Sequence, residues 1–348
     1  AFAALPFALV FLRPFLSSYD DLEVTYPMKK ITALLLALLM LVGVLAGCGK
    51  QNDTNKTDKL SIVTTIFPEY DWVREILGDK ADSAEITMLL DNGVDLHSYQ
   101  PTADDIVKLS DCDLFVYVGG ESDGWVEGAL KSAASKDRKV INLLEILGDS
   151  VKEEETVEGM QEEEEDHEEK EYDEHVWLSL KNAKTLVAAI SAALQELDPD
   201  NKDAYAANAD AYGQKLSALD AEYRKAVSAG TYKTLLFGYR FPFRYLVDDY
   251  GMSYYAAFVG CSAESEASFE TVSFLARKVD EGKLPCVLTI EGKNHKIAET
   301  IVQNTAGKNQ KILTMDSMQS TTSQDVARGR TYLSLMAKNL DVLKEALG

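Results

Sequence analysis

The stretch LDPDNKDAYAANADAYGQKLSALDAEYRKAVSAG, residues 197–230, decides how the rest of the chain is arranged. Asp198 suits a helix cap, Pro199 the first helical position and Gly230 the end of a helix. We therefore expect one long helix over residues 198–229. Its apolar side chains recur at intervals of three, four and seven, and they are Tyr205, Tyr212, Leu216, Leu219, Tyr223 and Val227. At about 1.5 Å per residue the helix would be about 40 Å long, enough to join two lobes, although a surface helix within one lobe would show the same pattern.

On both sides of this helix, short β-branched runs alternate with helical patterns, which is typical of α/β units with parallel strands. The runs before the helix are LSIVTTIF, AEITMLL, DLFVYV and KVIN, and those after it are TLLFG, YYAAFV, CVLTIE and KILTM. Four strands on each side predict an α/β protein with two similar lobes, each with a mainly parallel four-stranded sheet. We expect the first lobe over residues 60–197 and the second over residues 230–348, joined by the long, rigid helix.

The composition is that of a globular protein. The 348 residues are enough for two domains with hydrophobic cores, and 46% of them are hydrophobic. The formal net charge of −22 opposes binding to nucleic acid or to an anionic membrane surface, because both carry many negative charges. We therefore expect no nucleic-acid partner, and cations are the ligands that this composition favours.

An export signal begins at Met28. Two lysines follow, then the apolar run ITALLLALLMLVGVL, whose last residue, Leu45, begins the motif LAGC that ends in Cys48. This arrangement resembles a bacterial lipoprotein signal peptide over residues 28–47, which implies that Cys48 is lipidated and anchors the exported protein to the membrane on its extracytoplasmic face. An uncleaved transmembrane helix is the alternative, but the run is shorter than the ~20 residues that a span needs. We expect residues 1–27 to be an upstream extension outside the fold and residues 48–59 to be a flexible tether.

A strongly acidic segment covers residues 152–174 and contains His167. Like charges repel one another, so we expect this segment to be a disordered, solvated loop of the first lobe. It ends next to His175, and it either keeps the protein soluble or collects cations near the entrance of a site.

Three side chains that can bind a metal stand near the ends of predicted elements. His97, in VDLHSYQP, follows the second strand, and Asp316, in ILTMDSM, follows the last strand. His175, in YDEHVWLSL, precedes a helix that begins near Asn182. Ligands of open α/β sheets bind beyond the carboxyl ends of the strands, and Zn²⁺ accepts imidazole nitrogen and carboxylate oxygen. A shared metal ion is therefore a hypothesis, although no H-E-x-x-H or paired C-x-x-C motif supports it.

Four stretches resemble the metal-binding solute receptors of bacterial zinc and manganese ABC transporters. They are IVTTIFPEYDWVREILGDKA, DNGVDLHSYQPTADDIVKLSDCDLFVYVGG, YDEHVWLSLKNA and FPFRYLVDDYGM. The resemblance runs from about Leu60 to the C-terminus, and it implies two α/β lobes joined by a rigid helix with one metal ion between them. His97 and His175 match the family's two ligands in the first lobe, and Asp316 matches its carboxylate ligand near the C-terminus.

One ligand of the family does not carry over to this sequence. The family has a His or Glu that is followed by Phe at the third position and Tyr at the fifth, and Phe243 and Tyr245 therefore place Arg240 at this position. A guanidinium is only a donor and stays charged, so Arg240 cannot coordinate a cation. Arg240 could instead pair with Asp316 or a neighbouring carboxylate, or contact an anionic chelator that arrives with the metal.

Candidates for the missing ligand lie in GCSAESEAS, after the strand YYAAFV. They are Cys261, Glu264 and Glu266, and water is the other candidate. A thiolate beside two imidazoles would favour Zn²⁺, whereas further carboxylate oxygen would favour Mn²⁺ or Fe²⁺.

The resemblance implies an extracytoplasmic receptor, not an enzyme, which captures a divalent metal ion and delivers it to an ABC-transporter permease. Zinc is the first choice of metal, and Mn²⁺ and Fe²⁺ are the alternatives. Two other functions are weighed against it. A zinc-dependent hydrolase would use three protein ligands and a water, but no convincing general base or G-x-S-x-G motif is present. In a metal-stabilised surface adhesion lipoprotein the metal would be structural, and its removal would unfold the protein.

Overall fold

The structure is a computed structural model, and it describes most of the chain after residue 58. The described ranges are 59–132, 138–161, 171–262, 266–292 and 295–348. Lys59–Gly348 form one compact unit. The expected extension, signal peptide and lipidated Cys48 lie outside the described residues. Within the described ranges, no helix is both long enough and apolar enough to cross a membrane.

Two four-stranded sheets form the centre of the unit, and every strand pair in them is parallel. The first contains β1 (Ser61–Thr64), β2 (Glu85–Met88), β3 (Leu114–Tyr117) and β4 (Lys139–Asn142), in the order β2-β1-β3-β4. The second contains β5 (Thr234–Arg240), β6 (Ser253–Phe258), β7 (Cys286–Ile290) and β8 (Lys311–Met315), in the order β6-β5-β7-β8. Counted within each sheet, the two orders are the same. The prediction of two similar α/β lobes is confirmed.

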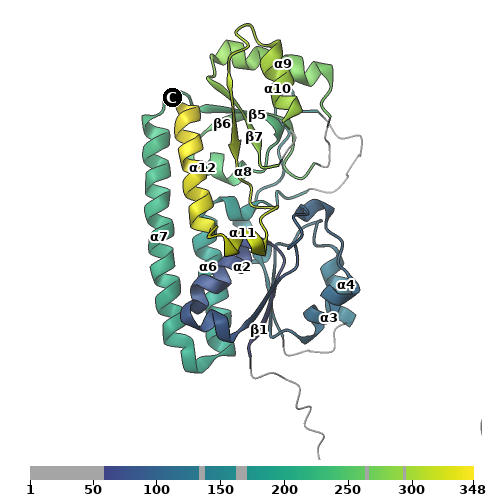
Figure 1. Ribbon diagram of the computed structural model, residues 1–348, viewed down its shortest axis with the longest axis vertical. Helices are drawn as coiled ribbons and strands as arrows, with labels where there is room; N and C mark the ends of the chain where they lie inside the picture. Colours follow the sequence, from purple (N-terminus) through teal and green to yellow (C-terminus); the bar gives the residue numbers. More distant parts are fainter. Residues whose placement is uncertain (1–58, 133–137, 162–170, 263–265, 293–294) are drawn as a thin grey trace, which may run out of the picture. The chain divides into compact units, whose positions relative to one another are not determined.

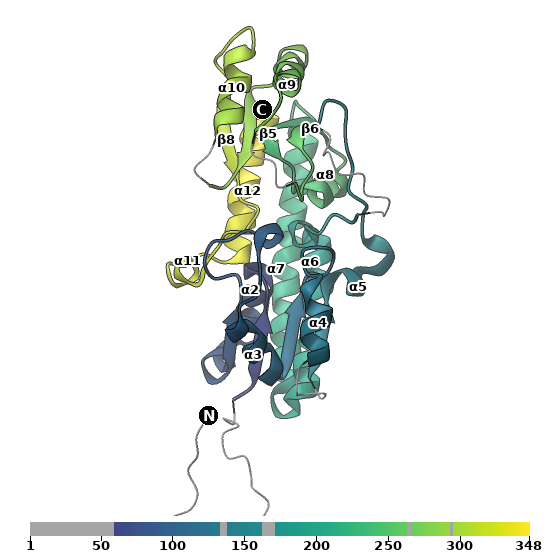
Figure 2. The same ribbon diagram turned by 90° about the vertical axis from the view of Figure 1, so that its right-hand side faces the viewer.

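Helices flank each sheet (Figure 1; Figure 2). Those of the first lobe are α2 (Phe67–Leu77), α3 (Ala103–Asp111), α4 (Trp125–Ser132), α5 (Leu143–Leu147) and α6 (Leu180–Leu197). Those of the second are α8 (Arg244–Tyr250), α9 (Phe269–Gly282), α10 (Lys296–Asn304) and α12 (Tyr332–Leu347). The short α11 (Ser323–Ala327) lies beside the first lobe, where the Ser323 hydroxyl donates to the Asp91 carboxylate (2.6 Å). Side-chain caps set several of the starts. For example, Ser179 Oγ accepts a hydrogen bond from Asn182 N (3.1 Å) at the start of α6, which fixes the chain just after His175.

The expected long helix is α7 (Lys202–Ala229), preceded by a short turn at Pro199–Asn201 and ended at Gly230. It packs against α2 and α6 of the first lobe and against α8 and α12 of the second, as Figure 1 shows. The residues of its predicted apolar face are buried, except Leu219, which is partly buried. The helix therefore joins both lobes, and a helix confined to one lobe is excluded.

A second connection runs through α12, which packs against both α7 and α2. The Tyr332 hydroxyl donates to the Trp177 carbonyl (2.6 Å), and the Trp177 indole donates to the Ser317 carbonyl (2.9 Å). Tyr332 N donates to the buried carboxylate of Asp71 on α2 (2.9 Å). Because these polar groups are buried and paired across the lobes, breaking any one of them leaves an unpaired group without water.

The two described limbs of the acidic segment are ordered, so the expected disorder does not hold for them. Glu154 N donates to the Glu171 carbonyl (3.0 Å) and Asp173 N to the Lys152 carbonyl (2.9 Å). The first limb then continues along β6, where Gln161 N donates to the Ala257 carbonyl (2.9 Å). Residues 162–170, with His167, lie outside the described residues. The limbs bring acidic side chains from a first-lobe segment onto the second lobe.

Candidate metal centre

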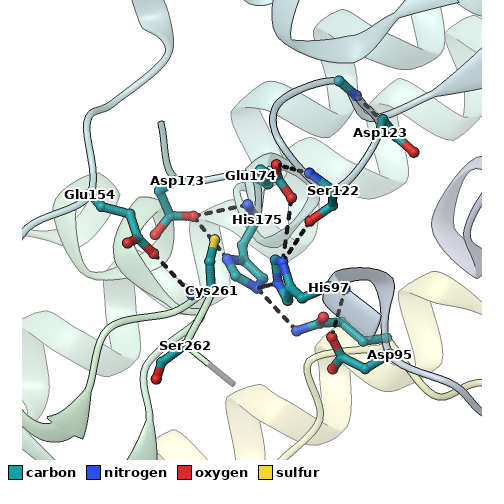
Figure 3. Close-up of polar contacts among 12 residues, drawn as sticks. Asp95, His97, Ser122, Asp123, Glu154, Asp173, Glu174, His175, Cys261 and Ser262 are labelled. Atoms are coloured by element: carbon teal, nitrogen blue, oxygen red, sulfur yellow. Dashed lines mark hydrogen bonds and ion pairs between the residues drawn. The ribbon is translucent and has the colours of Figure 1, made fainter. Parts of the chain in front are cut away.

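Three side chains with metal-binding atoms meet where the lobes join. They are His97, His175 and Cys261, and their candidate ligand atoms all lie within 4.8 Å of one another. His97 lies in the short turn Leu96–Ser98 after β2, and Cys261 follows β6, the corresponding edge strand of the second sheet. Figure 3 shows the two imidazoles side by side with the sulfur next to them.

The two imidazoles face each other through their Nε2 atoms, which are 3.2 Å apart. The Nδ1 atom of His175 is 3.0 Å from a carboxylate oxygen of Asp173, which can accept a hydrogen bond from the ring at this position. The Nδ1 atom of His97 is 2.8 Å from Ser122 Oγ and 3.5 Å from Glu174 Oε2, which favours the same tautomer. In this tautomer, two nitrogen lone pairs point at the same space. Ligand atoms 2.0–2.1 Å from a tetrahedral Zn²⁺ lie about 3.3 Å apart, so the observed separation suits a shared ion.

The loop around His175 fixes its position. The Asp173 carboxylate accepts from both His175 N (2.9 Å) and the ring, and both residues are buried. Gly260 lies against the ring on the other side, and a Cβ added there would sit 3.1 Å from ring atoms and 2.9 Å from the Phe241 carbonyl. A side chain at position 260 would therefore push the Cys261 loop away from the imidazole.

First-lobe residues hold His97. Asp95 caps its turn, since an Asp95 carboxylate oxygen accepts from His97 N (3.0 Å). Glu174 accepts from Ser122 N (2.9 Å) and approaches the ring. Burial raises the pKa of Glu174 to about 7. Gly120, with a φ of 81°, makes room for Glu174, because a Cβ at Gly120 would lie 2.2 Å from its carboxylate.

Cys261 is held through its backbone by the first acidic limb, because Cys261 N donates to Glu154 Oε1 (2.9 Å). The thiol lies in a cavity of about 260 Å³. The cavity is lined by His97, Glu121, Ser122, Glu154, Glu171, Tyr172, Glu174, Cys261 and Ser262. Its acidic lining makes it an attractive environment for a cation.

Burial shifts the pKa of two of the candidate ligands. Burial and the neighbouring His175 lower the pKa of His97 to about 3, so this ring is neutral at physiological pH. Burial, together with the charges of Glu154 and Asp173, raises the pKa of the Cys261 thiol well above its usual value. The arrangement can therefore accept a soft dication between two imidazoles and a thiol, with loss of the thiol proton.

Asp316, the carboxylate expected in the site, does not join this group. A carboxylate oxygen of Asp316 accepts from Met318 N (2.9 Å), and Asn339 binds its backbone N and O. Asp316 is used to build the turn after β8, and in this structure Cys261 takes its place in the candidate ligand set. Of the other candidates, Glu266 is exposed and outside the group, and Glu264 lies outside the described residues.

Arg240 pairs with Asp95, not with Asp316. Arg240 Nη1 also contacts the carbonyl of Ser262 (3.5 Å). Burial alone would raise the pKa of Asp95, but the charge of Arg240 and the nearby His97 hold it below its usual value. Arg240 therefore connects the loop of His97 to the loop of Cys261.

Sequence reasoning missed the residues that orient the imidazoles, namely Asp95, Ser122, Asp173 and Glu174. It also missed Gln319, a buried side chain in the turn after β8. One end of the Gln319 amide is 3.0 Å from His175 Nε2, and the other faces both carboxylate oxygens of Asp95 at 2.9 and 3.0 Å. The sequence itself pointed only to Asp173 and Glu174, which directly precede His175 in YDEHV, as partners for an imidazole.

Several known proteins are similar to this chain. The zinc-binding lipoprotein AdcA of Streptococcus pneumoniae is 33% identical over 91% of this chain and 61% of its own length. The high-affinity zinc uptake system protein ZnuA of Bacillus subtilis is 31% identical over 87% of this chain and 94% of its own length. The crystal structure of the Zn(II)-bound ZnuA-like domain of Streptococcus pneumoniae AdcA matches with a TM-score of 0.65 at 31% identity, over 83% of this chain and 99% of the domain.

The chain spans about three fifths of the length of AdcA. The family model described as zinc-uptake complex component A, periplasmic (ZnuA), matches residues 62–346. This range includes both sheets, the long helix and the three side chains of the candidate centre. Because the match covers most of its length, the chain belongs to the ZnuA family of zinc-uptake components.

Proposed function

We propose that this chain is an extracytoplasmic solute-binding receptor that captures Zn²⁺ and delivers it to an ABC-transporter permease. The observation that carries the proposal is the pair of Nε2 atoms 3.2 Å apart, with their Nδ1 atoms hydrogen-bonded and a thiol beside them. The names of the relatives support it, because AdcA is named as zinc-binding and ZnuA of Bacillus subtilis as part of a zinc uptake system. Neither is named as an enzyme.

His97, His175 and Cys261 would bind the metal in this receptor. Sulfur and imidazole nitrogen favour Zn²⁺ over Mn²⁺, which prefers oxygen ligands. Because the ligands come from both lobes, bound metal stabilises the closed arrangement by its differential affinity, and the long helix keeps the movement small. Export and a lipid anchor on Cys48 would hold the receptor near its permease, as the signal-like sequence and the lipoprotein relatives suggest.

Metal competition on the purified full chain tests this proposal. The protein is stripped with a chelator, and its affinities for Zn²⁺ and Mn²⁺ are measured against a chromophoric chelator. His97→Ala, His175→Ala and Cys261→Ser should each weaken zinc binding by more than the 10–100-fold that loss of an outer partner typically costs. His295→Ala is the matched control, because His295 contacts Thr289 and is not in the cluster.

Two results would contradict the proposal. The first is a wild-type chain that binds no zinc, or binds manganese more tightly than zinc. The second is a loss of affinity in His295→Ala that equals the loss in the cluster variants. Thermal unfolding of each metal-free variant shows whether it is folded.

A further inference from the structure

The three atoms of the candidate centre leave one position of a tetrahedral zinc site unassigned, and Gln319 lies beside it. The residue comes from the second lobe, in the turn between β8 and α11, and is 2% exposed. Its amide touches His175 Nε2 (3.0 Å), one of the two nitrogens that face the proposed metal position. This inference rests on the proposed metal site and names a further ligand for it.

The contacts of the amide determine which end faces the imidazole. With its oxygen toward Asp95, the amide would place that oxygen 2.9 and 3.0 Å from two carboxylate oxygens, all of them acceptors. With its nitrogen toward Asp95, both contacts become hydrogen bonds. The second orientation therefore holds, and it turns the Gln319 oxygen toward His175 Nε2.

This orientation places the Gln319 oxygen beside two imidazole nitrogens that can bind a metal. When His175 carries its proton on Nε2, the Gln319 oxygen accepts a hydrogen bond from it, and when the proton is on Nδ1, beside Asp173, the Nε2 nitrogen and the oxygen can both bind a metal ion. The Nε2 of His97 lies 3.2 Å from the same nitrogen. The separations of 3.0 and 3.2 Å are close to the about 3.3 Å expected between ligands of a tetrahedral Zn²⁺.

We propose that the amide oxygen of Gln319 is the fourth metal ligand, and that Arg240 and Asp95 hold the amide in the binding orientation. The Asp95 carboxylate accepts hydrogen bonds from the Gln319 amide nitrogen and from the His97 backbone N–H. Arg240 forms an ion pair with the same carboxylate. The arginine at the family's ligand position thus acts on the metal through two neighbours. It is a positioning residue, and the ligand itself comes from Gln319.

Zinc competition on the full chain tests the proposal with three variants. Gln319→Ala removes the oxygen and should weaken zinc binding about tenfold or more, by comparison with the loss of an outer-shell partner. Asp95→Asn removes one acceptor and allows the amide to reverse, so that its nitrogen donates to His175 Nε2 and competes with zinc. Gln324→Ala is the control, because Gln324 is an exposed residue of α11 near Gln319, and its affinity should equal that of wild type.

A crystal structure of the zinc-loaded wild-type chain gives the readout that a merely structural role would not change. The proposal expects the Gln319 oxygen about 2.0–2.2 Å from zinc, the usual distance for an oxygen ligand. A water in the fourth position, with Gln319 outside bonding distance, would overturn it. This measurement also decides the matter if Gln319→Ala fails to fold.

The outcomes separate this inference from the proposed function. A wild-type chain without zinc affinity contradicts both. A wild-type chain that binds zinc, with Gln319→Ala and Gln324→Ala equal to it, contradicts only the role of Gln319. The role of Gln319 is supported if Gln319→Ala and Asp95→Asn bind zinc more weakly than wild type and Gln324→Ala does not. The thermal stability of the metal-free variants must be unchanged.

Discussion

Zinc binding should release a proton from Cys261. Burial and the neighbouring carboxylates of Glu154 and Asp173 raise the pKa of this thiol well above its usual value, so the metal-free protein holds it protonated near neutral pH. Zinc binds the thiolate, and therefore each zinc displaces one thiol proton. Below the thiol pKa, this release makes zinc affinity rise about tenfold for each pH unit, or about 1.4 kcal/mol.

His97 and Glu174 contribute differently to the pH dependence of zinc affinity. The pKa of His97 is lowered to about 3, mainly by burial, so His97 has no proton to lose at neutral pH. The pKa of Glu174 is raised to about 7 by burial. A dication close to Glu174 favours its charged form, so Glu174 should release a further fraction of a proton when the pH is below about 7. Glu174→Gln should abolish this fractional proton release and leave the release of the Cys261 proton unchanged.

Isothermal titration of the stripped full chain in two buffers with different ionisation enthalpies counts the released protons. Measured at about pH 8, where Glu174 is mostly ionised, wild type should release about one proton more than Cys261→Ser. Glu174→Gln should match wild type at this pH and release fewer protons at about pH 6. If wild type and Cys261→Ser release equal numbers of protons, the thiol is not a ligand and the reasoning fails.

Three further predictions concern the surroundings of the site and the junction of the lobes. Asp173→Asn keeps an acceptor for His175 but removes the charge, and competition titration should show zinc affinity about 10–100-fold weaker; equal affinity would contradict the role of Asp173. Tyr332→Phe leaves the buried Trp177 carbonyl without its donor, and urea unfolding of the metal-free protein should show a loss of about 1–3 kcal/mol; no loss would mean that another group replaces the hydroxyl. Burial raises the pKa of Asp71 from 3.8 to about 7, so the folded state binds the carboxyl proton more tightly than the unfolded state does. The protonated carboxyl therefore adds to the free energy of unfolding in full below about pH 4, and this contribution is lost as the pH rises through about 7. Asp71→Asn should therefore raise the thermal midpoint at about pH 8 relative to wild type and change it little at about pH 4, and the same shift at both pH values would count against this.

Local patterns in the sequence were sufficient for the fold. The eight β-branched runs are the eight strands, because strand and helix periods are properties of neighbouring residues. The spacing of Tyr205, Tyr212 and Tyr223 predicted a helix that could join two lobes, since a helix of that length has one continuous apolar face. Only packing could decide between a helix that joins both lobes and one that lies within a single lobe.

The site was predicted less completely, because its ligands depend on how loops from different lobes meet. The pairing of His97 with His175 was expected, but Asp316 and Gln319 lie in the same turn, and their spacing does not say which of them faces the imidazoles. Met318, with a φ of 66°, lies between them in a left-handed conformation that the sequence does not reveal. Burial, which lowers the pKa of His97 to about 3, likewise depends on how the loops pack.

The two helices that connect the lobes, α7 and α12, limit how far the lobes can separate. Swinging the lobes widely apart would expose the apolar faces of both helices and separate Tyr332 from Trp177 and Asp71. In the proposed receptor, zinc would therefore leave through local movement of the segments that carry its ligands, without a wide separation of the lobes.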